Sequence, residues 1–520
     1  MLTFEAEYCK DPDAEKPYDY SDWAASMACG RTWLAKCMEN HTDCQVSRSS
    51  ERTPRDTSGV SYRIGTSEPI AYRPTRLIEI GQPEADRVRL RLCSELDSSS
   101  PQYATLSHCW GTSKTLRLTS DSFQRLRNGV AVSELAKTFQ DAIFTARSLG
   151  IKLLWIDSFC IFQDSKKDWQ RESALMSQVY RHSFLNIAAS IAADSDAGCF
   201  RKRASTVEPY LVQTAWTNRP NGTYYLYDRH YWIDNFKRMP LNQRAWVIQE
   251  LTLPPRVLHL CGSQMFWECY GLNACEIWPT GLPPNMSISS VKSTSWAAAI
   301  DIFGFAWTND IKTLRISTDK NELNTTTFRE LWARIVSDYS KCDLTFPSDK
   351  LVALSGIAKH MEQLLDIEYC AGLWRIDLIP GLAWYVDTQS VRQLEADSIT
   401  YRAPSWSWAC LDGPISWHGY HGMEWQPLVD IICCDVRTAT AERTGAVLGA
   451  ALQISGWLAT IELHPLGVTW KFCLDGRWNS LSRHNFNLDR RPPSSRLHCL
   501  PLFVEGRSCL LYTSPSPRDS

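Results

Sequence analysis

The sequence predicts an α/β fold, in which a parallel sheet is flanked by helices, for the first half of the chain. Two observations lead to this prediction, and a third indicates the class of the C-terminal region. Strand-like and helix-like segments alternate between residues 103 and 190, and polar residues stand directly after two of the strand-like segments. Short alternating apolar runs from about residue 401 onward indicate a β-rich C-terminal region. Strand–helix–strand order favours parallel pairing with right-handed crossovers.

The expected strands of this passage are short and apolar, and the expected helices carry apolar residues at helical spacing on one face. In chain order we expect a strand at Tyr103–Ser107, a helix at Ser133–Leu149, a strand at Lys152–Ile156, a helix from about Ser165, and a strand at Phe184–Ser190. Gly150 is expected to end the first helix, because glycine adopts the left-handed conformation that closes many helices. Ser165 and Asp168 have the spacing of a capping box at the start of the second helix.

Further segments on both sides complete the expected organisation. Strands are expected at residues 72–81 and Arg87–Leu92, a helix at Arg244–Leu251, a hairpin at Arg256–Cys261 and Gln264–Cys269, helices at Phe328–Tyr339 and Lys350–Leu365, and strands at Leu452–Ile461 and Val468–Leu474. The expected parts are an irregular N-terminal segment with a Cys/His cluster (1–70), an α/β domain (71–275, core 100–270), a linker or long loop (276–327), and a helical and then β-rich region (328–508).

The end of the chain is a separate part. Residues 509–520 resemble the in-frame translation of a transposase sequencing adapter. We therefore expect the natural gene product to diverge near Ser508, and the last residues to contribute nothing to fold or function.

Composition and charge exclude several classes of protein. The chain has 520 residues, of which 44% are hydrophobic, enough for the cores of two or three domains. Its formal net charge is −2 without a block of like charge, so no nucleic-acid partner is expected. The longest smooth apolar stretch, near Phe184–Ala193, has about half the length of a membrane span, so no transmembrane helix is expected. Without a secretory signal, the 19 cysteines are expected to be mostly buried free thiols of a cytoplasmic protein.

Two acidic residues are candidates for catalysis. Asp157 directly follows a buried strand, at the edge of the sheet where α/β proteins bind ligands. The alternative for Asp157 is that it caps the next turn. Glu250 has apolar neighbours such as Trp246 and Leu251, which predict partial shielding and a raised pKa. Arg244 does not share a helix face with Glu250, so it is expected to pair with an acid from another element, of which Asp157 is one.

Cys37, His41 and Cys44 have donor types and a spacing that zinc uses. A short amphipathic helix that presents these side chains to the core is the preferred alternative, because cysteine is often a small buried hydrophobe. On the sequence alone no metal is therefore assigned, and the three residues stand as a candidate zinc set.

Several catalytic signatures are absent from the sequence. It contains no Gly-x-Gly-x-x-Gly, no Walker loop and no His-Glu-x-x-His, so the usual motifs of dinucleotide dehydrogenases, NTPases and zincins are missing. Ser107 and His108 are adjacent but lack a Gly-x-Ser-x-Gly elbow, and neighbours on a strand point to opposite faces. An acyl-transfer triad is therefore not expected there.

Three segments join apolar residues to a few polar ones at the end of an element: YATLSHCWG at Tyr103–Gly111, LWIDSFCIFQD at Leu154–Asp164 and RAWVIQEL at Arg244–Leu251. In order, spacing and local sequence they resemble the signature blocks of the fungal heterokaryon-incompatibility (HET) family. The resemblance extends over most of residues 33–415. It implies a role in fungal non-self recognition, in which fusion of incompatible cells triggers regulated cell death, and it implies protein partners or self-association.

The segment Trp246–Leu251 is also similar to the Trp-Cys-x-x-Glu-Leu helix of Toll/interleukin-receptor (TIR) domains, with Val247 in place of the cysteine. This similarity implies a flavodoxin-like sheet. It also implies that Glu250 is the catalytic carboxylate of an NAD-cleaving domain. The pocket would then be shaped by Asp157, Trp110, Arg244 and Trp246. NAD would be the substrate, and no cofactor is assigned. The alternatives are a non-enzymatic module that self-associates or binds a partner to signal death, and an orphan protein without toxic activity.

Overall fold

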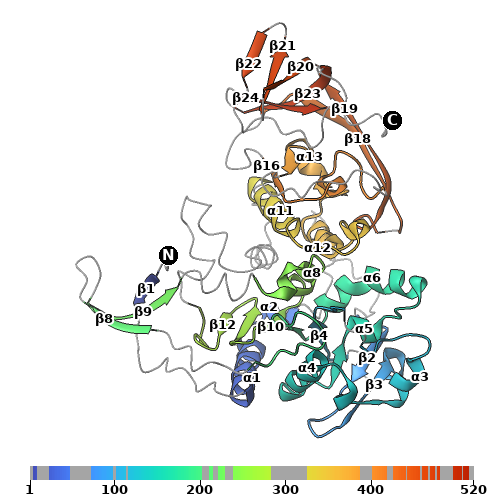
Figure 1. Cartoon of the computed structure of the whole chain (residues 1–520), viewed down its shortest axis with the longest axis vertical. Helices are drawn as coiled ribbons and strands as arrows, with labels where there is room; N and C mark the ends of the chain where they lie inside the picture. The colour runs from blue at the N-terminus through green and yellow to red at the C-terminus, as the bar shows by residue number, and fades with distance from the viewer. Residues whose placement is uncertain are drawn as a thin grey trace, which may run out of the picture. The chain divides into compact units, whose positions relative to one another are not determined.

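The chain forms two compact units, Met1–Ile316 and Ser317–Ser520, in a computed structural model (Figure 1). The structure describes residues 4–8, 23–46, 72–97, 101–112, 115–201, 210–214, 221–228, 238–282, 325–386, 401–417, 426–440, 442–456, 459–466, 469–474, 477–480, 496–505 and 508–513. Most of the expected linker at 276–327 lies outside these ranges.

The first unit is built around a sheet whose central strands are parallel. Across the sheet, its described strands are β12 (Asn273–Cys275), β11 (Met265–Cys269), β10 (Arg256–Leu260), β7 (Leu185–Ala188), β4 (Ala104–Ser107), β6 (Leu153–Trp155), β2 (Arg76–Glu79), β3 (Arg87–Leu92) and β5 (Val130–Ala131). The neighbours β10, β7, β4 and β6 pair in parallel, and the flanking strands are antiparallel. Numbered along the chain, the parallel strands lie in the order 2-1-3-4, as in flavodoxin-like sheets. The predicted α/β class is confirmed.

Helices cover both faces of the parallel strands. Figure 1 shows α1 (Trp23–Asn40) and α4 (Lys137–Ser148) on one face, and α6 (Lys166–Arg181) and α8 (Val247–Thr252) on the other. The predicted helix across α4 is confirmed, and it buries Phe139 and Ile143 against the sheet. Gly150 follows this helix with φ +76°, the left-handed conformation that the sequence predicted for it.

The N-terminal helix α1 belongs to the same core as the sheet. Met27, Trp33 and Cys37 are buried in one cluster with residues of the central strands. The Trp33 indole donates a hydrogen bond of 2.8 Å to the carbonyl of Pro279. Residues 23–46 therefore pack as part of the first unit, where the sequence indicated a compact cluster and a short amphipathic helix within an otherwise irregular segment.

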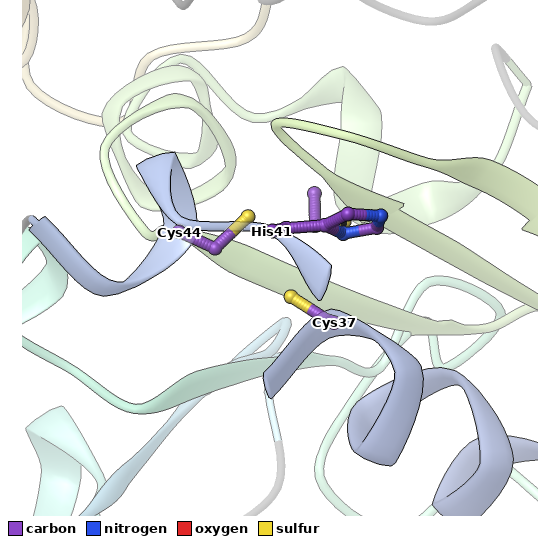
Figure 2. Close-up of side chains that lie close together, drawn as sticks. Cys37, His41 and Cys44 are labelled. Atoms are coloured by element: carbon purple, nitrogen blue, oxygen red, sulfur yellow. Dashed lines mark hydrogen bonds between the residues drawn. The ribbon is translucent and has the colours of Figure 1, made fainter. Parts of the chain in front are cut away.

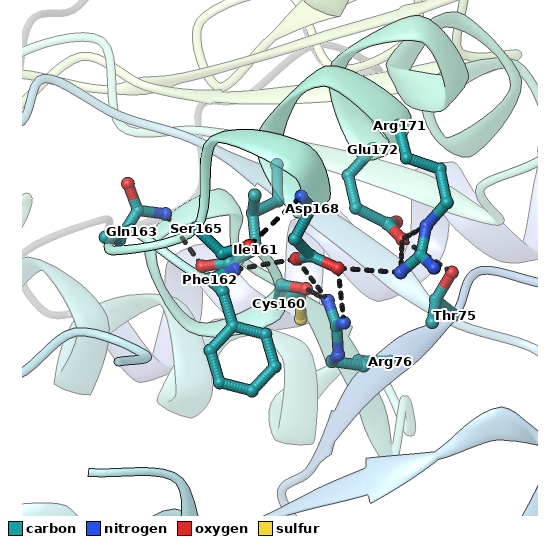
Figure 3. A network of polar contacts seen from close by, with 10 residues as sticks. All are labelled: Thr75, Arg76, Cys160, Ile161, Phe162, Gln163, Ser165, Asp168, Arg171 and Glu172. Carbon is teal, nitrogen blue, oxygen red and sulfur yellow. Dashed lines mark hydrogen bonds and ion pairs between the residues drawn. The ribbon is translucent and has the colours of Figure 1, made fainter. Parts of the chain in front are cut away.

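A buried ion pair joins β2 to the start of α6 (Figure 3). Arg76 donates to both carboxylate oxygens of Asp168, at 2.9 and 2.7 Å, and to the carbonyl of Cys160 at 2.7 Å. Asp168 also accepts from the backbone N–H of Phe162 at 2.9 Å. Ser165 caps the helix as predicted, accepting from the Asp168 N–H at 3.3 Å. The Asp168 carboxylate, however, binds Arg76 rather than completing the predicted capping box.

The second unit contains the predicted helices and a β-rich end. Its helices include α11 (Thr325–Tyr339) and α12 (Ser355–Leu365), and its longer strands are β18 (Val429–Thr438), β19 (Val447–Gly456), β20 (Ala459–Leu466), β21 (Thr469–Leu474), β23 (Arg496–Glu505) and β24 (Ser508–Thr513). The strand β24 overlaps the expected adapter segment and pairs antiparallel with β23. Within the described parts of the chain, no helix is both long and apolar enough to cross a membrane.

Candidate functional site

The predicted site residues gather at the carboxyl edge of the parallel strands β4, β6 and β7. Ser107 ends β4, and Asp157 follows β6 after one residue. The helix α8 packs on β4 and β7 and brings Glu250 to the same edge. Ligands of open α/β sheets bind at this edge, because loops and helix N-termini converge there.

Glu250 is buried, with 5% of its surface exposed. Burial raises its pKa to about 7, because water no longer solvates the charged carboxylate. Arg244 and the hydroxyls of Ser107 and Tyr180 partly oppose this effect. A carboxyl group with a pKa near 7 exchanges its proton close to neutral pH, which is the range useful for acid–base or electrostatic catalysis.

Asn186 on β7 fixes the position of α8 above the sheet. Its amide donates 2.9 Å to the Glu250 carbonyl and 3.1 Å to the Ser107 hydroxyl. Its amide oxygen accepts from the Thr105 hydroxyl at 2.9 Å. Sequence reasoning missed this residue, although an asparagine inside a buried apolar strand signals a polar partner.

Asp157 lies close enough to Glu250 for its charge to raise the pKa of that carboxyl further. Its carboxylate accepts from the Trp110 indole at 2.7 Å and from the Ser158 N–H at 2.6 Å, and it lies 3.7 Å from the His108 ring. Its side chain is 22% exposed. The helix α5 (Asp157–Cys160) has Ile156 at its N-cap position, so Asp157 is not the capping residue.

His108 is buried against Phe139 of α4. Burial lowers its pKa to about 4; Asp157 partly opposes this shift, and Arg244 and Arg117 add to it. The imidazole is therefore neutral at neutral pH. The side chains of Ser107 and His108 contact opposite faces of the sheet, as strand alternation requires, so they do not form a nucleophile–base pair.

Of the remaining predicted binding residues, Arg244 lies close enough to Glu250 to lower the pKa of its carboxyl. Arg244 donates to the carbonyl of His108, and among the described residues it forms no ion pair with Asp157. The guanidinium of Arg117 lies 5.0 Å from the centre of the Trp110 ring, so one face of the indole is covered. Trp246 is half-buried at the N-terminus of α8.

Gly111, directly after Trp110, is expected to tolerate no side chain. Its φ is +64°, and a Cβ there would lie 2.2 Å from the Cβ of Asp194. Gly111→Ala should lower the free energy of unfolding by about 1–3 kcal/mol more than Gly150→Ala, because only the first meets a neighbour. Gly150 has φ +76° and open space around it, so it controls for the conformational cost alone. Chemical denaturation of both variants checks this, and equal losses would contradict the close approach of Asp194 to Gly111.

The predicted zinc ligands are also brought together, but at the other edge of the sheet. Cys37, His41 and Cys44 lie side by side, and the structure adds Cys269 to them. Sequence reasoning missed Cys269, which stands far along the chain from the other three.

The fold and the site define an α/β domain with a buried glutamate at the carboxyl edge of a flavodoxin-ordered sheet. Residues 103–250 match the family model described as heterokaryon incompatibility protein (HET). Over these residues the chain is similar to the HET family, and the predicted family resemblance is confirmed there. The match begins at Tyr103, at the start of the first signature block, and ends at Glu250. No curated protein and no solved structure matches the chain.

Proposed function

We propose that the HET domain kills fungal cells after incompatible fusion, and that it does so by cleaving NAD with Glu250. The family match supports the role in heterokaryon incompatibility. The observation that carries the chemistry is the Glu250 carboxyl, with its pKa of about 7 at the carboxyl edge of the sheet. We expect this action in the cytoplasm, the compartment that the many free thiols indicate.

In the proposed reaction, the bond between the nicotinamide nitrogen and the ribose C1 breaks, and its electron pair leaves with nicotinamide. The ribosyl carbon becomes positively charged, and the ionised Glu250 carboxylate stabilises it electrostatically. Water then adds to C1 and releases a proton, which yields ADP-ribose. Asp157, Trp110, Arg244 and Trp246 would shape the pocket, as the TIR similarity implies.

The burial of Glu250 has a consequence for regulation. With 5% of its surface exposed, the carboxylate does not reach a substrate in the conformation described. We therefore propose that self-association or a protein partner moves α8 or Trp246 to open the site. Death would then depend on assembly, as expected for a protein that must remain harmless until fusion.

A non-enzymatic role is the second candidate. It is favoured by the packing of α8, since all six residues of this helix are buried and Asn186 holds the Glu250 carbonyl. In that case the signature blocks would serve as the core of a module that self-associates or binds a partner to signal death.

Conditional expression in fungal cells separates the two roles. Wild type should kill cells and lower their NAD content, whereas Glu250→Gln should do neither. Glu276→Gln, which changes another buried glutamate outside the site, should behave like wild type. Death caused by Glu250→Gln at the wild-type level, or wild-type death without NAD loss, would favour the interaction module.

A further inference from the structure

Four metal-binding side chains meet in the first unit, away from the site just described. One ligand atom from each of Cys37, His41, Cys44 and Cys269 lies within 4.8 Å of the others. Figure 2 shows Cys37, His41 and Cys44 close together. We propose that these four residues bind one zinc ion, which holds the N-terminal helices on the sheet.

The spacing of the ligand atoms suits tetrahedral zinc. Zn–S bonds of about 2.3 Å and Zn–N bonds of about 2.0–2.1 Å place neighbouring ligand atoms roughly 3.6–3.8 Å apart. The His41 Nδ1 and Cys269 Sγ atoms are 3.3 Å apart. Since no pair exceeds 4.8 Å, the four atoms need to move by only about 1 Å or less to coordinate an ion.

Local backbone structure brings the ligands together. Cys37 lies in the last turn of α1, and Cys44 lies in the short helix α2 (Asp43–Val46). Backbone bonds from His41 to the Cys37 carbonyl and from Cys44 to the His41 carbonyl, 3.1 and 3.2 Å, fold the connection between them. Cys269 ends β11. A Cβ at Gly271 would lie 2.6 Å from the His41 ring, so glycine there leaves room for the imidazole.

A buried arginine supplies the charge that such a site requires. Arg256 is 1% exposed, and it donates to the Cys37 sulfur and to the carbonyls of Phe184 and Cys44, each at 3.1 Å. Among the described residues no carboxylate forms an ion pair with it. Zinc bound by three thiolates and a neutral imidazole has a net charge of −1, which the guanidinium neutralises. Neutral thiols would instead leave a buried cation uncompensated.

The ligand set and its position indicate a structural site. All four coordination positions come from the protein, so none is left for water or a substrate. Cys269 lies opposite Arg256, the first residue of β10, at the amino edge of the parallel strands. The zinc would therefore join α1 and α2 to the sheet at the edge opposite Glu250, and its binding would contribute to folding.

Metal analysis of the purified full chain tests this proposal. We expect about one zinc ion per chain by inductively coupled plasma mass spectrometry. Exchange for cobalt should give the intense visible bands of a tetrahedral thiolate site. Both measurements use wild type, so they do not depend on whether a variant folds.

Matched variants assign the ligands. Cys269→Ser and His41→Ala should lose the zinc, whereas His41→Cys should retain it as a four-cysteine site. Cys261→Ser changes another buried thiol of the same unit and should keep the full complement. Arg256→Gln should weaken zinc binding by about 10- to 100-fold, as the loss of a partner of a metal ligand does.

Three results would overturn the proposal. The first is folded wild-type protein that holds no stoichiometric zinc and gives no cobalt spectrum. The second is full zinc content in Cys269→Ser. The third is a disulfide among Cys37, Cys44 and Cys269 in freshly purified protein.

Discussion

Asp168→Asn is expected to lower the free energy of unfolding of the first unit by about 3–5 kcal/mol, the usual cost of breaking a buried ion pair. The side chains of Arg76 and Asp168 are only 7% and 10% exposed. Asparagine keeps the shape of the side chain but leaves the buried guanidinium without its counter-charge. It also exchanges one carboxylate oxygen for an amide N–H₂ group beside donors of Arg76 or Phe162.

Denaturation by urea at pH 7 checks this expectation, with Glu134→Gln as the matched control. Glu134 pairs with Arg125 at 2.5 Å, but both side chains are exposed, so this variant should change stability by about 1 kcal/mol or less. Similar losses in the two variants would show that the buried Arg76–Asp168 pair contributes no more stability than an exposed one. Burial alone would raise the pKa of Asp168, but Arg76 and the Phe162 N–H lower it overall. The pair's contribution should therefore be present above about pH 4 and be lost as the pH falls below it.

Glu250→Gln and His108→Phe are expected to change the free energy of unfolding, relative to wild type, with opposite dependences on pH. The folded pKa of Glu250 is about 7, above its ordinary value of 4.5. The folded state therefore binds more protons than the unfolded state between these values, and Glu250 takes stability away as the pH rises through them. Glu250→Gln should thus gain about 1.4 kcal/mol per pH unit relative to wild type, or about 3 kcal/mol in all by pH 7.

His108 has the reverse sign. Its folded pKa of about 4 lies below its ordinary value of 6.5, so wild type loses the stability linked to this group as the pH falls from 6.5 to 4. His108→Phe should gain relative to wild type over that fall. In wild type, the pH-dependent contributions of Glu250 and His108 to the free energy of unfolding nearly cancel between about pH 4.5 and 6.5. Unfolding free energies of the three proteins at several pH values check this, and parallel curves would show that neither group is buried in the folded state as described.

The stability of Glu250→Gln also bears on function. Replacing a glutamate that has only a structural role should lower the free energy of unfolding. Glu250→Gln is instead expected to raise it at neutral pH. Lost activity in this variant would therefore not come from unfolding. A gain in stability together with a loss of function is the usual sign of a residue retained for activity.

Much of the fold was predictable because its signals are local. The strands β4, β6 and β7 and the helices α4 and α6 have the periodicity and the capping residues of their class, and their order along the chain predicts parallel pairing. The antiparallel additions at the sheet edges, including the pairing of β2 with β6, depend on contacts between distant segments. The N-terminal part of α1, ahead of the short amphipathic helix expected around Cys37, was missed because its buried face is rich in small and polar residues, such as Ser26 and Gly30.

The candidate site was predictable only in part. Asp157 and Glu250 were found because polar residues at the ends of apolar elements stand out in a sequence. The proximity of their two carboxyl groups, and the support of Glu250 by Asn186, depend on how the sheet is assembled. Cys269 shows the limit most clearly, since nothing in its local sequence connects it with Cys37, His41 and Cys44.

Nicotinamide release from NAD by the purified full chain, at concentrations that allow self-association, distinguishes an NAD-cleaving enzyme from an interaction module. Wild type and Glu276→Gln should release nicotinamide, with a rate that rises with pH through about 7 as Glu250 ionises. Glu250→Gln should be at least about 100-fold slower, because it lacks the charge that stabilises the ribosyl cation. No release from folded, assembled wild type, or equal release by Glu250→Gln, would contradict an NAD-cleaving role for this glutamate.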